Sequence, residues 1–278
     1  IYTGNGDDTK WVGGIQEGQE PGIIVGYKKN FIIQDMSQVP EGYIDIAAGS
    51  ESSTQRYLYH DQKGLDKLAE MGITKNLVKL EPGDVIWQDM NGDGIIDTHD
   101  RAVLGHRTPH WTGGFNTTLS WKGLQLYARF DMGFDFSVYD GNLGWYLGCA
   151  QGAYNATEEV KDTWTPENPG AKYPRYTFAS QLGTDNWIRR SDILTESGAY
   201  LACRELQLSY TLPMNICSKF ACKGLSVSVT GQNLGYLKKT TVPLPDNQHA
   251  SNLTSNNSGN GGTYNLPRTV LFGLNLTF

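Results

Sequence analysis

The sequence lacks any long apolar run and carries little positive charge. No stretch of about 18 consecutive apolar residues, the shortest run typical of a transmembrane helix, occurs in the chain. This absence excludes a helical membrane protein but not a membrane β-barrel, whose short strands alternate between apolar and polar residues. The net charge of −6 argues against a nucleic-acid-binding surface, which would normally be basic. We therefore expect no nucleic-acid partner.

Cysteines are few, and the familiar catalytic motifs are absent. Of the four cysteines, only Cys217 and Cys222 are close in sequence; they are either bridged, as an oxidising compartment would permit, or remain two small thiols. No CxxC pair indicates a zinc site. The chain also has no HExxH, no GxSxG, no phosphate-binding loop and no dinucleotide fingerprint. We therefore predict that the protein is not an enzyme and has no catalytic residues.

The composition is poor in apolar residues and rich in glycine and aromatic residues. Apolar residues make up 38% of the 278 residues, which is low for a soluble core of this size, whereas Gly (33), Tyr (15) and Trp (7) are abundant. This profile is typical of an all-β protein with long polar loops. An outer-membrane barrel fits well, because it needs only a thin apolar band facing lipid around a polar lumen.

Five segments alternate between apolar and polar residues, which is typical of strands with one apolar face. The clearest runs to the last residue, where Val270, Phe272, Leu274, Leu276 and Phe278 fall on one face. The other four segments are 115–121, 124–132, 204–212 and 225–233. Together they predict an antiparallel sheet with an apolar side and a polar side.

Two features favour a membrane barrel over a soluble β-sandwich, whose strands also have one apolar face. Trp111 and Trp121 bracket a strand of about ten residues, which at a tilt of about 40° spans roughly 25 Å, the height of a barrel's lipid-facing band. The connections are also unequal, because Lys122-Gly123 is a short turn whereas 137–198 and 234–267 are long and polar. Outer-membrane barrels have short periplasmic turns and long extracellular loops.

The region before Trp111 predicts a further strand over 22–33 and then one large extracellular excursion over 34–110. Residues 62–71 predict a short helix within this excursion, because their apolar residues share one helical face. The chain begins with Ile1, with no Met and no signal peptide, and we interpret it as a fragment.

The sharpest local motif is the acidic loop 89–100, which has the ligand order of an EF-hand-type calcium loop. Gly94 stands at the sixth position, where such a loop turns sharply. Oxygen ligands would come from five side chains and one backbone carbonyl. These residues are Asp89, Asn91, Asp93, Ile95 (carbonyl), Asp97 and Asp100. We expect structural calcium here, and an acidic turn without an ion is the alternative.

The last six residues form a second motif. Gly273, Leu274, Leu276 and the terminal aromatic Phe278 resemble the signal read by the outer-membrane barrel assembly machinery. A plain edge strand of a soluble sheet is the alternative, although so apolar an exposed edge would invite aggregation.

A series of short blocks runs along most of the chain. It comprises VGYK (25–28), PGDV (82–85), the loop 89–101, LG (104–105), Pro109, GGFN (113–116), WTPENP (164–169), YPR (173–175), YL (200–201), LSYTLP (208–213), GQNL (231–234), PRT (267–269) and GLNL (273–276). In order and spacing this series resembles the SusC/RagA family of TonB-dependent outer-membrane transporters of Bacteroidota.

The resemblance implies a barrel of about 22 antiparallel strands closed by an N-terminal plug. Residues 1–278 would be the C-terminal part of that barrel in the cell outer membrane, without the plug domain. Members of the family pair with a SusD-like surface lipoprotein and are driven by the TonB-ExbB-ExbD complex. They import glycans in many cases and peptides in some, so the resemblance implies nutrient import as the function.

Side-chain roles and one rival function stay open at the level of sequence. Five polar-side residues are expected either to line the lumen or to pack within the wall; they are Gln125, Arg129, Glu205, Gln207 and Gln232. Trp145, Tyr146 and Trp187 are expected either to stack on sugar rings or to pack within loops, and the substrate-binding residues are unknown. The rival function is a calcium-stabilised, β-rich surface binding or adhesion protein.

Overall fold

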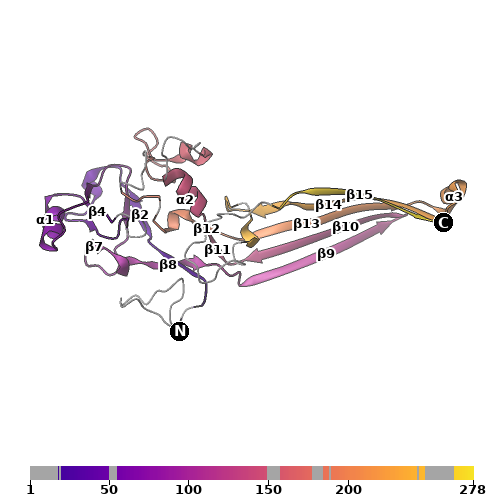
Figure 1. Cartoon of the computed structure of the whole chain (residues 1–278), viewed down its shortest axis with the longest axis horizontal. Coiled ribbons are helices and arrows are strands. Elements are labelled where there is room, and N and C mark those ends of the chain that lie inside the picture. Colours follow the sequence, from indigo (N-terminus) through magenta and orange to yellow (C-terminus); the bar gives the residue numbers. More distant parts are fainter. Residues whose placement is uncertain are drawn as a thin grey trace. The chain divides into compact units, whose positions relative to one another are not determined.

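The structure is a computed structural model, and it describes residues 18, 20–49, 55–148, 157–176, 184–187, 189–242, 244–247 and 266–278. The chain divides into two compact units (Figure 1). The described residues within Ile1–Arg107 and Tyr139–Glu196 form the unit that we call the loop unit. Those within Thr108–Val138, Ser197–Ala250 and Gly262–Phe278 form the unit that we call the sheet unit. Among the described residues, no helix is both long and apolar enough to cross a membrane.

The sheet unit is built on five long antiparallel strands, which confirms the five alternating segments. In sheet order they are β15 (Thr269–Thr277), β14 (Gly224–Lys238), β13 (Tyr200–Thr211), β10 (Leu124–Phe134) and β9 (Trp111–Trp121). Each pairs with its neighbour over most of its length (Figure 1). The bounds of β9 coincide with the two tryptophans that the sequence placed at the edges of an apolar band.

A tight turn joins β9 to β10. Trp121 pairs with Leu124, so only Lys122 and Gly123 connect the strands, and both have positive φ angles, 48° and 87°. This is the two-residue hairpin turn whose twist matches that of the flanking strands. A Cβ on Gly123 would lie 2.6 Å from the carbonyl oxygen of Thr211, so glycine is required for close packing as well as for conformation.

Short and long connections alternate between the strands, as the sequence predicted. The link from β13 to β14 is short and contains α3 (Met214–Cys217) and η6 (Ser218–Phe220). Between β10 and β13 the chain passes through a long segment with β11 (Ser137–Tyr139), α2 (Gly141–Gly148), η3 (Glu158–Asp162), η5 (Asp192–Leu194) and β12 (Thr195–Ser197). The link from β14 to β15 contains η7 (Pro245–Asn247). Cys217 and Cys222 are free thiols.

Short strands and one helix make up the rest of the loop unit. β1 (Ile23–Gly26) pairs with β8 (Ala102–His106), and β2 (Lys29–Ile32) pairs with β6 (Val85–Trp87). A mixed sheet has the order β5 (Leu77–Lys79), β4 (Tyr57–Tyr59), β3 (Ile44–Asp45) and β7 (Ile95–Ile96). The remaining elements are η1 (Met36–Gln38), α1 (Gln62–Glu70) and η2 (Thr98–Asp100). α1 confirms the predicted helix and begins where the Asp61 carboxylate accepts the amide of Gly64.

The expectation of a single strand over 22–33 was wrong. Two strands form instead, separated at Tyr27, whose amide donates to the carbonyl of Arg190 (3.0 Å). Ile23 and Ile24 are both buried, as are Ile32 and Ile33. Consecutive buried apolar residues are typical of strands covered on both faces, whereas a barrel strand has one polar side. This segment therefore belongs to the core of the loop unit.

That core is large and contains a buried ion pair. It gathers aromatic and aliphatic side chains from most elements of the unit, including Tyr27, Trp87 and Trp187. The Arg189 side chain, only 2% exposed, donates to both carboxylate oxygens of Asp45 (2.8 and 3.1 Å). Its guanidinium lies 4.6 Å from the Tyr27 ring centroid and 5.1 Å from that of Trp87. The bidentate geometry and two aromatic faces offset part of the cost of burying the charge.

Candidate functional site

The register of the long sheet places the apolar residues of all five strands on one side, which we call the apolar face. Below the register shifts, paired positions continue from strand to strand, and two rows of apolar residues cross all five strands. One such row comprises Leu119, Leu126, Leu208, Val229 and Phe272. A second comprises Trp121, Leu124, Tyr210, Val227 and Leu274. The alternation seen in each segment thus becomes one continuous surface.

The apolar face is uncovered. Phe272 is 82% exposed, Leu274 67% and Leu119 62%, although side chains of this kind are normally buried in water-soluble proteins. Neighbouring residues pack only sideways, as in the stack of Phe115 on Phe130 at a centroid distance of 4.9 Å. Two apolar sheet faces pressed together, as in a sandwich, would have buried these side chains.

The opposite side of the sheet, which we call the polar face, carries the five residues that the sequence predicted either to line the lumen or to pack within the wall. Arg129 pairs with Glu205, and Glu205 pairs in turn with Gln232. Gln125 and Gln207 occupy the same parity on their strands. All five predicted residues therefore share one face.

One feature of the polar face was missed by sequence reasoning. The pairing of β13 shifts register between Cys203 and Glu205, so Arg204 is an extra residue in a β-bulge. Its side chain reaches Asp131, Tyr236 and Asp246. A bulge interrupts strict alternation, and a charged residue beside Glu205 was the only local sign of it.

The acidic loop 89–100 is closed by hydrogen bonds between its own side chains and amides. The Asp89 carboxylate accepts from Gly92 (2.6 Å) and Gly94 (2.7 Å), which have φ angles of +79° and +78°. Asp93 accepts from the amide of Ile95 (2.8 Å). The loop then enters β7, which pairs with β3. Its acidic side chains and its glycines therefore shape one compact turn.

Asp100, the last residue of the acidic loop, lies inside the loop unit. It is fully buried and accepts from the amides of Met90 (2.7 Å) and Asp97 (2.8 Å), so it joins the two ends of the loop. Burial raises the pKa of this carboxyl, and the amides of Asp97 and Met90 only partly offset the effect. The donor set is oxygen throughout, which fits a hard cation. Among the described residues, no three of the loop's four carboxylates offer oxygens within 4.8 Å of one another.

Three of the blocks that carry the family resemblance meet in the loop unit. Asp84 of the PGDV block accepts from Nε of Arg175 in the YPR block (2.6 Å). A Cβ on Gly83 would lie 2.4 Å from the ring of Trp164 in the WTPENP block. Burial lowers the pKa of Arg175, but the hydrogen bond and charge of Asp84 outweigh it and raise the pKa. These blocks are therefore packing determinants of the unit.

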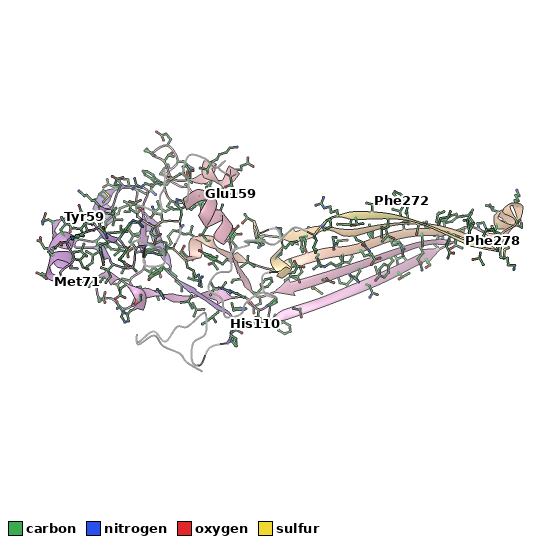
Figure 2. All side chains as sticks on the ribbon, in the orientation of Figure 1. Tyr59, Met71, His110, Glu159, Phe272 and Phe278 are labelled. Atoms are coloured by element: carbon green, nitrogen blue, oxygen red, sulfur yellow. The ribbon has the colours of Figure 1, made fainter. Side chains whose placement is uncertain are left out.

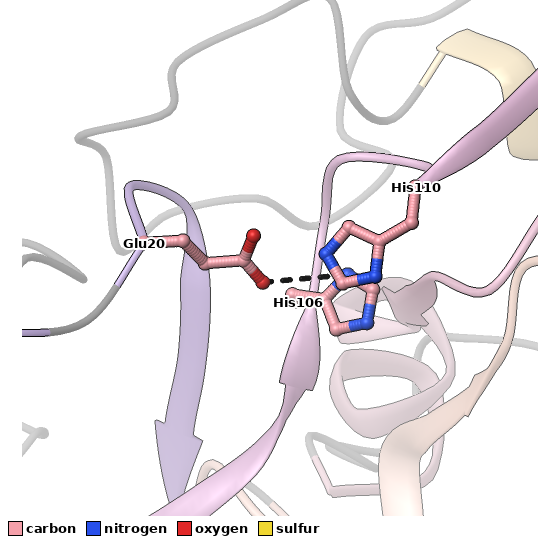
Figure 3. Close-up of side chains that lie close together, drawn as sticks. All are labelled: Glu20, His106 and His110. Carbon is pink, nitrogen blue, oxygen red and sulfur yellow. Dashed lines mark ion pairs between the residues drawn. The ribbon is translucent and has the colours of Figure 1, made fainter.

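The described histidines and aromatics have local structural roles. His106 Nδ1 lies 3.7 Å from Glu20 Oε1 within the loop unit (Figure 3), and His110 Nδ1 lies 2.9 Å from Asp135 Oδ2 within the sheet unit. Trp187 is fully buried, and its ring N–H donates to the carbonyl of Arg175 (3.2 Å), so loop packing and not sugar stacking accounts for it. The side chains of Trp145 and Tyr146 lie outside the described residues.

The strand at the chain's end, β15, occupies an edge of the sheet. Gly273, Leu274 and Leu276 pair with residues of β14, and a Cβ on Gly273 would lie 2.4 Å from the Ser228 hydroxyl. Phe278 follows the strand and is 77% exposed (Figure 2). Leu274, Leu276 and Phe278 have the parity of the apolar face.

Comparison with known proteins identifies relatives over about seven tenths of the chain. It is 34% identical over 207 residues to TonB-dependent receptor P26 of Formosa agariphila, covering 70% of this chain and 20% of that receptor. It is 29% identical over 204 residues to TonB-dependent receptor P3 of the same organism, covering 71% of this chain and 19% of the receptor. The chain thus spans about a fifth of the length of these relatives. No family model matches it.

Two solved structures share the fold. The RagAB peptide importer in its 'closed-closed' state matches with a TM-score of 0.52 and 21% identity, over 70% of this chain and 21% of that chain. A structure of the RagAB peptide transporter matches with the same values. The antiparallel sheet therefore has the fold of a segment of a transporter barrel, as the sequence predicted.

Proposed function

We propose, from the premise that this chain belongs to the TonB-dependent receptors, that it supplies barrel wall and outer loops to an importer of nutrients in the cell outer membrane. The uncovered apolar face of the long sheet is the observation that carries this proposal. A calcium-stabilised adhesion protein in water would need to bury such a face, so the rival function has no comparable support.

The two faces of the sheet have different roles in this proposal. The apolar face meets lipid hydrocarbon, and the antiparallel ladder satisfies the backbone N–H and C=O groups that lipid cannot. The polar face, with Arg129, Glu205 and Gln232, borders the path of a polar solute or the plug that fills it. The excursion 34–110, the segment 137–198 and the segment that follows β14 lie on the extracellular side. The predicted start of that last segment at residue 234 was wrong, because β14 extends to Lys238.

The proposed partners follow from the family. A SusD-like lipoprotein covers the outer opening, and the TonB-ExbB-ExbD complex supplies energy through the rest of the protein. The structurally similar RagAB is a peptide importer, and the SusC resemblance favours glycans, so the substrate is an oligosaccharide or a peptide. Both are polar oligomers that suit a polar lumen.

The acidic loop is proposed to hold structural calcium. Oxygen ligands would come from Asp89, Asn91, Asp93, Asp97 and Asp100, with the Ile95 carbonyl. Asp100 links the two ends of the loop to the core of the unit, so an ion there would hold the loop in one conformation. The ion would supply charge neutralisation among the carboxylates and no chemistry.

The edge strand β15 is proposed to be the segment read during barrel assembly, through Gly273, Leu274, Leu276 and Phe278. Its support is the exposed terminal aromatic on the apolar-face parity. Replacing Phe278 by Ala in the full-length receptor should lower the assembled fraction, measured by heat-modifiable electrophoretic mobility, whereas Thr277→Ala should not. Equal assembly of the two variants would end this part of the proposal.

Import itself is tested in the native bacterium by deleting the full-length gene and measuring uptake of labelled oligosaccharides and labelled peptides. One class should lose uptake and regain it with the wild-type gene. The regained uptake should vanish when the proton gradient that drives TonB is collapsed. Undiminished uptake of both classes in the deletion strain would contradict the proposal.

A further inference from the structure

A short segment after β14 folds against the polar face of the sheet instead of leaving it. In this segment, which comprises residues 240–242 and 244–247, Thr240, Val242 and Leu244 are all buried. Val242 is fully buried in a small cluster with Phe136, Val138, Tyr200 and Ala202. We call this segment the inner strap.

The register shows which face the inner strap covers. Ala202 pairs with Asp131 on one side and with Tyr236 on the other. Asp131 lies two residues from Arg129 on the same strand and therefore shares its polar face. Val242 belongs to the same buried cluster as Ala202, and Asp246 of the strap pairs with Arg204, so the inner strap lies against the polar face and away from the apolar one.

The bulged residue Arg204 ties the inner strap to the wall. Its Nε donates to Asp131 (2.6 Å) and one terminal nitrogen donates to the Tyr236 hydroxyl (2.9 Å). The other terminal nitrogen forms an ion pair with Asp246, in η7 of the strap. The Tyr236 hydroxyl also lies 3.1 Å from both carboxylate oxygens of Asp246. Wall and strap thus share one hydrogen-bonded cluster.

The contact between Arg204 and the strap is shielded from solvent, whereas the side chain of Asp131 on the wall is 41% exposed. The side chain of Arg204 is 12% exposed and that of Asp246 is 17% exposed. Charge-assisted hydrogen bonds in such surroundings are stronger than those at a surface, and loss of one partner leaves the other charge unpaired. A plain alternating strand would have pointed Arg204 to the opposite face from Glu205, so the bulge is what makes this anchor possible.

We propose that the inner strap is a fixed constriction at one end of the lumen and that Arg204 is its positioning residue. This rests on the proposed function, because the polar face borders a lumen only in a closed barrel. The strap is attached at the end of the sheet opposite the Lys122-Gly123 turn, so it narrows the entrance. The ammonium of Lys238, at the end of β14, also donates to the Val242 carbonyl of the strap, so two cationic residues of the wall hold the strap in place. The strap therefore shapes the opening by its position.

The first test measures attachment of the strap without any transport. In the full-length receptor with Cys149, Cys203, Cys217 and Cys222 replaced by Ser, Val242→Cys provides a buried thiol for a maleimide probe in isolated outer membranes. Asp246→Leu, which alters only the strap, should raise the labelling rate at least tenfold. Arg204→Leu should do the same from the wall side.

The matched control is Arg129→Leu, which removes a cation from the same polar face at a position paired with Glu205. It should leave the labelling rate within twofold. Equal labelling rates in the Asp246→Leu variant and in its parent would show that Asp246 does not hold the strap against the wall. Because Asp246→Leu leaves all five strands unchanged, misfolding of Arg204→Leu would not obscure the result.

The second test separates the constriction from the import function. With the transported substrate class, Asp246→Leu should raise the KM for uptake about tenfold and leave the saturated rate within twofold. Faster labelling with unchanged KM would overturn the constriction. Absence of uptake by the wild-type receptor would instead contradict the proposed function. The labelling result would remain valid, because it measures attachment of the strap without transport.

Discussion

The loop unit and the sheet unit place their apolar residues in opposite ways. The loop unit packs aromatic and aliphatic side chains inward and closes around the Arg189–Asp45 pair, as a water-soluble domain does. The described part of the sheet unit buries a small cluster around Val242 and exposes rows of Leu, Val and Phe. The same residue types are therefore buried in one unit and exposed in the other, and the sequence pattern differs accordingly. Apolar residues alternate in the long strands and run consecutively in the loop unit.

The largest expected effect tests the loop unit as a water-soluble core. Asp45→Leu should lower its free energy of unfolding by about 3–5 kcal/mol, because Arg189 would keep a buried charge without its bidentate partner. Hydrogen exchange of core amides in the full-length receptor measures this. The control is Lys63→Ala, which breaks an exposed pair with Glu41 and should cost at most about 1 kcal/mol. Similar exchange rates in the two variants would show that the buried ion pair stabilises the loop unit no more than the exposed pair does.

The second prediction tests the sheet unit against lipid. Leu206 lies on the apolar face near the middle of the sheet, where Leu206→Arg should destabilise the barrel by about 2–4 kcal/mol. Gln207→Arg, one residue away on the polar face, should have a much smaller effect. Urea titration of the receptor in lipid vesicles, followed by heat-modifiable mobility, compares them. If Gln207→Arg proved the more harmful, the assignment of the two faces would be reversed.

The third prediction concerns the acidic loop. Calcium at about 100 times its dissociation constant should slow local opening of residues 89–100 by about a hundredfold, equivalent to about 2.7 kcal/mol. Exchange of these amides with calcium and with a chelator provides the comparison. Asp93→Ala should abolish the difference, whereas Glu70→Ala on α1 should preserve it. Identical exchange rates with calcium and with the chelator would show that the loop does not bind calcium.

The smallest effect concerns the start of α1. Burial acts to raise the pKa of Asp61, but hydrogen bonds from the amides of Gly64 and Gly42 lower it below its usual value of 3.8. The cap therefore stabilises the helix fully above that value and loses its effect as the pH falls through the lowered pKa. At neutral pH, Asp61→Ala should cost about 1 kcal/mol, and Asp66→Ala on the same helix much less. Amide exchange of the helix, measured as a function of pH, would show whether the helix stabilities of the two variants become equal in acid.

Periodicity predicted the sheet unit well and the loop unit poorly. The alternating segments became β9, β10, β13, β14 and β15 because a strand with one apolar face and one polar face must alternate. The pattern gave only one weak sign of the Arg204 bulge, a charged residue beside Glu205. The role of Arg204 depends on Asp131, Tyr236 and Asp246 from other elements. The pattern also did not separate β1 from β2, since an apolar run buried on both faces lacks the alternation that marks a strand. The acidic loop's turn was evident from its glycines, while its ion stays a prediction.

Contact of the apolar face with lipid is tested most directly by measuring which medium surrounds each face of β9. Spin labels at Leu119→Cys, on the apolar face, and at Thr118→Cys, on the polar face, can be compared in the full-length receptor in lipid bilayers. Dissolved oxygen should relax the label at residue 119 more strongly, and a water-soluble nickel chelate the label at residue 118. Equal access of the nickel chelate to both positions would show that the apolar face does not contact lipid.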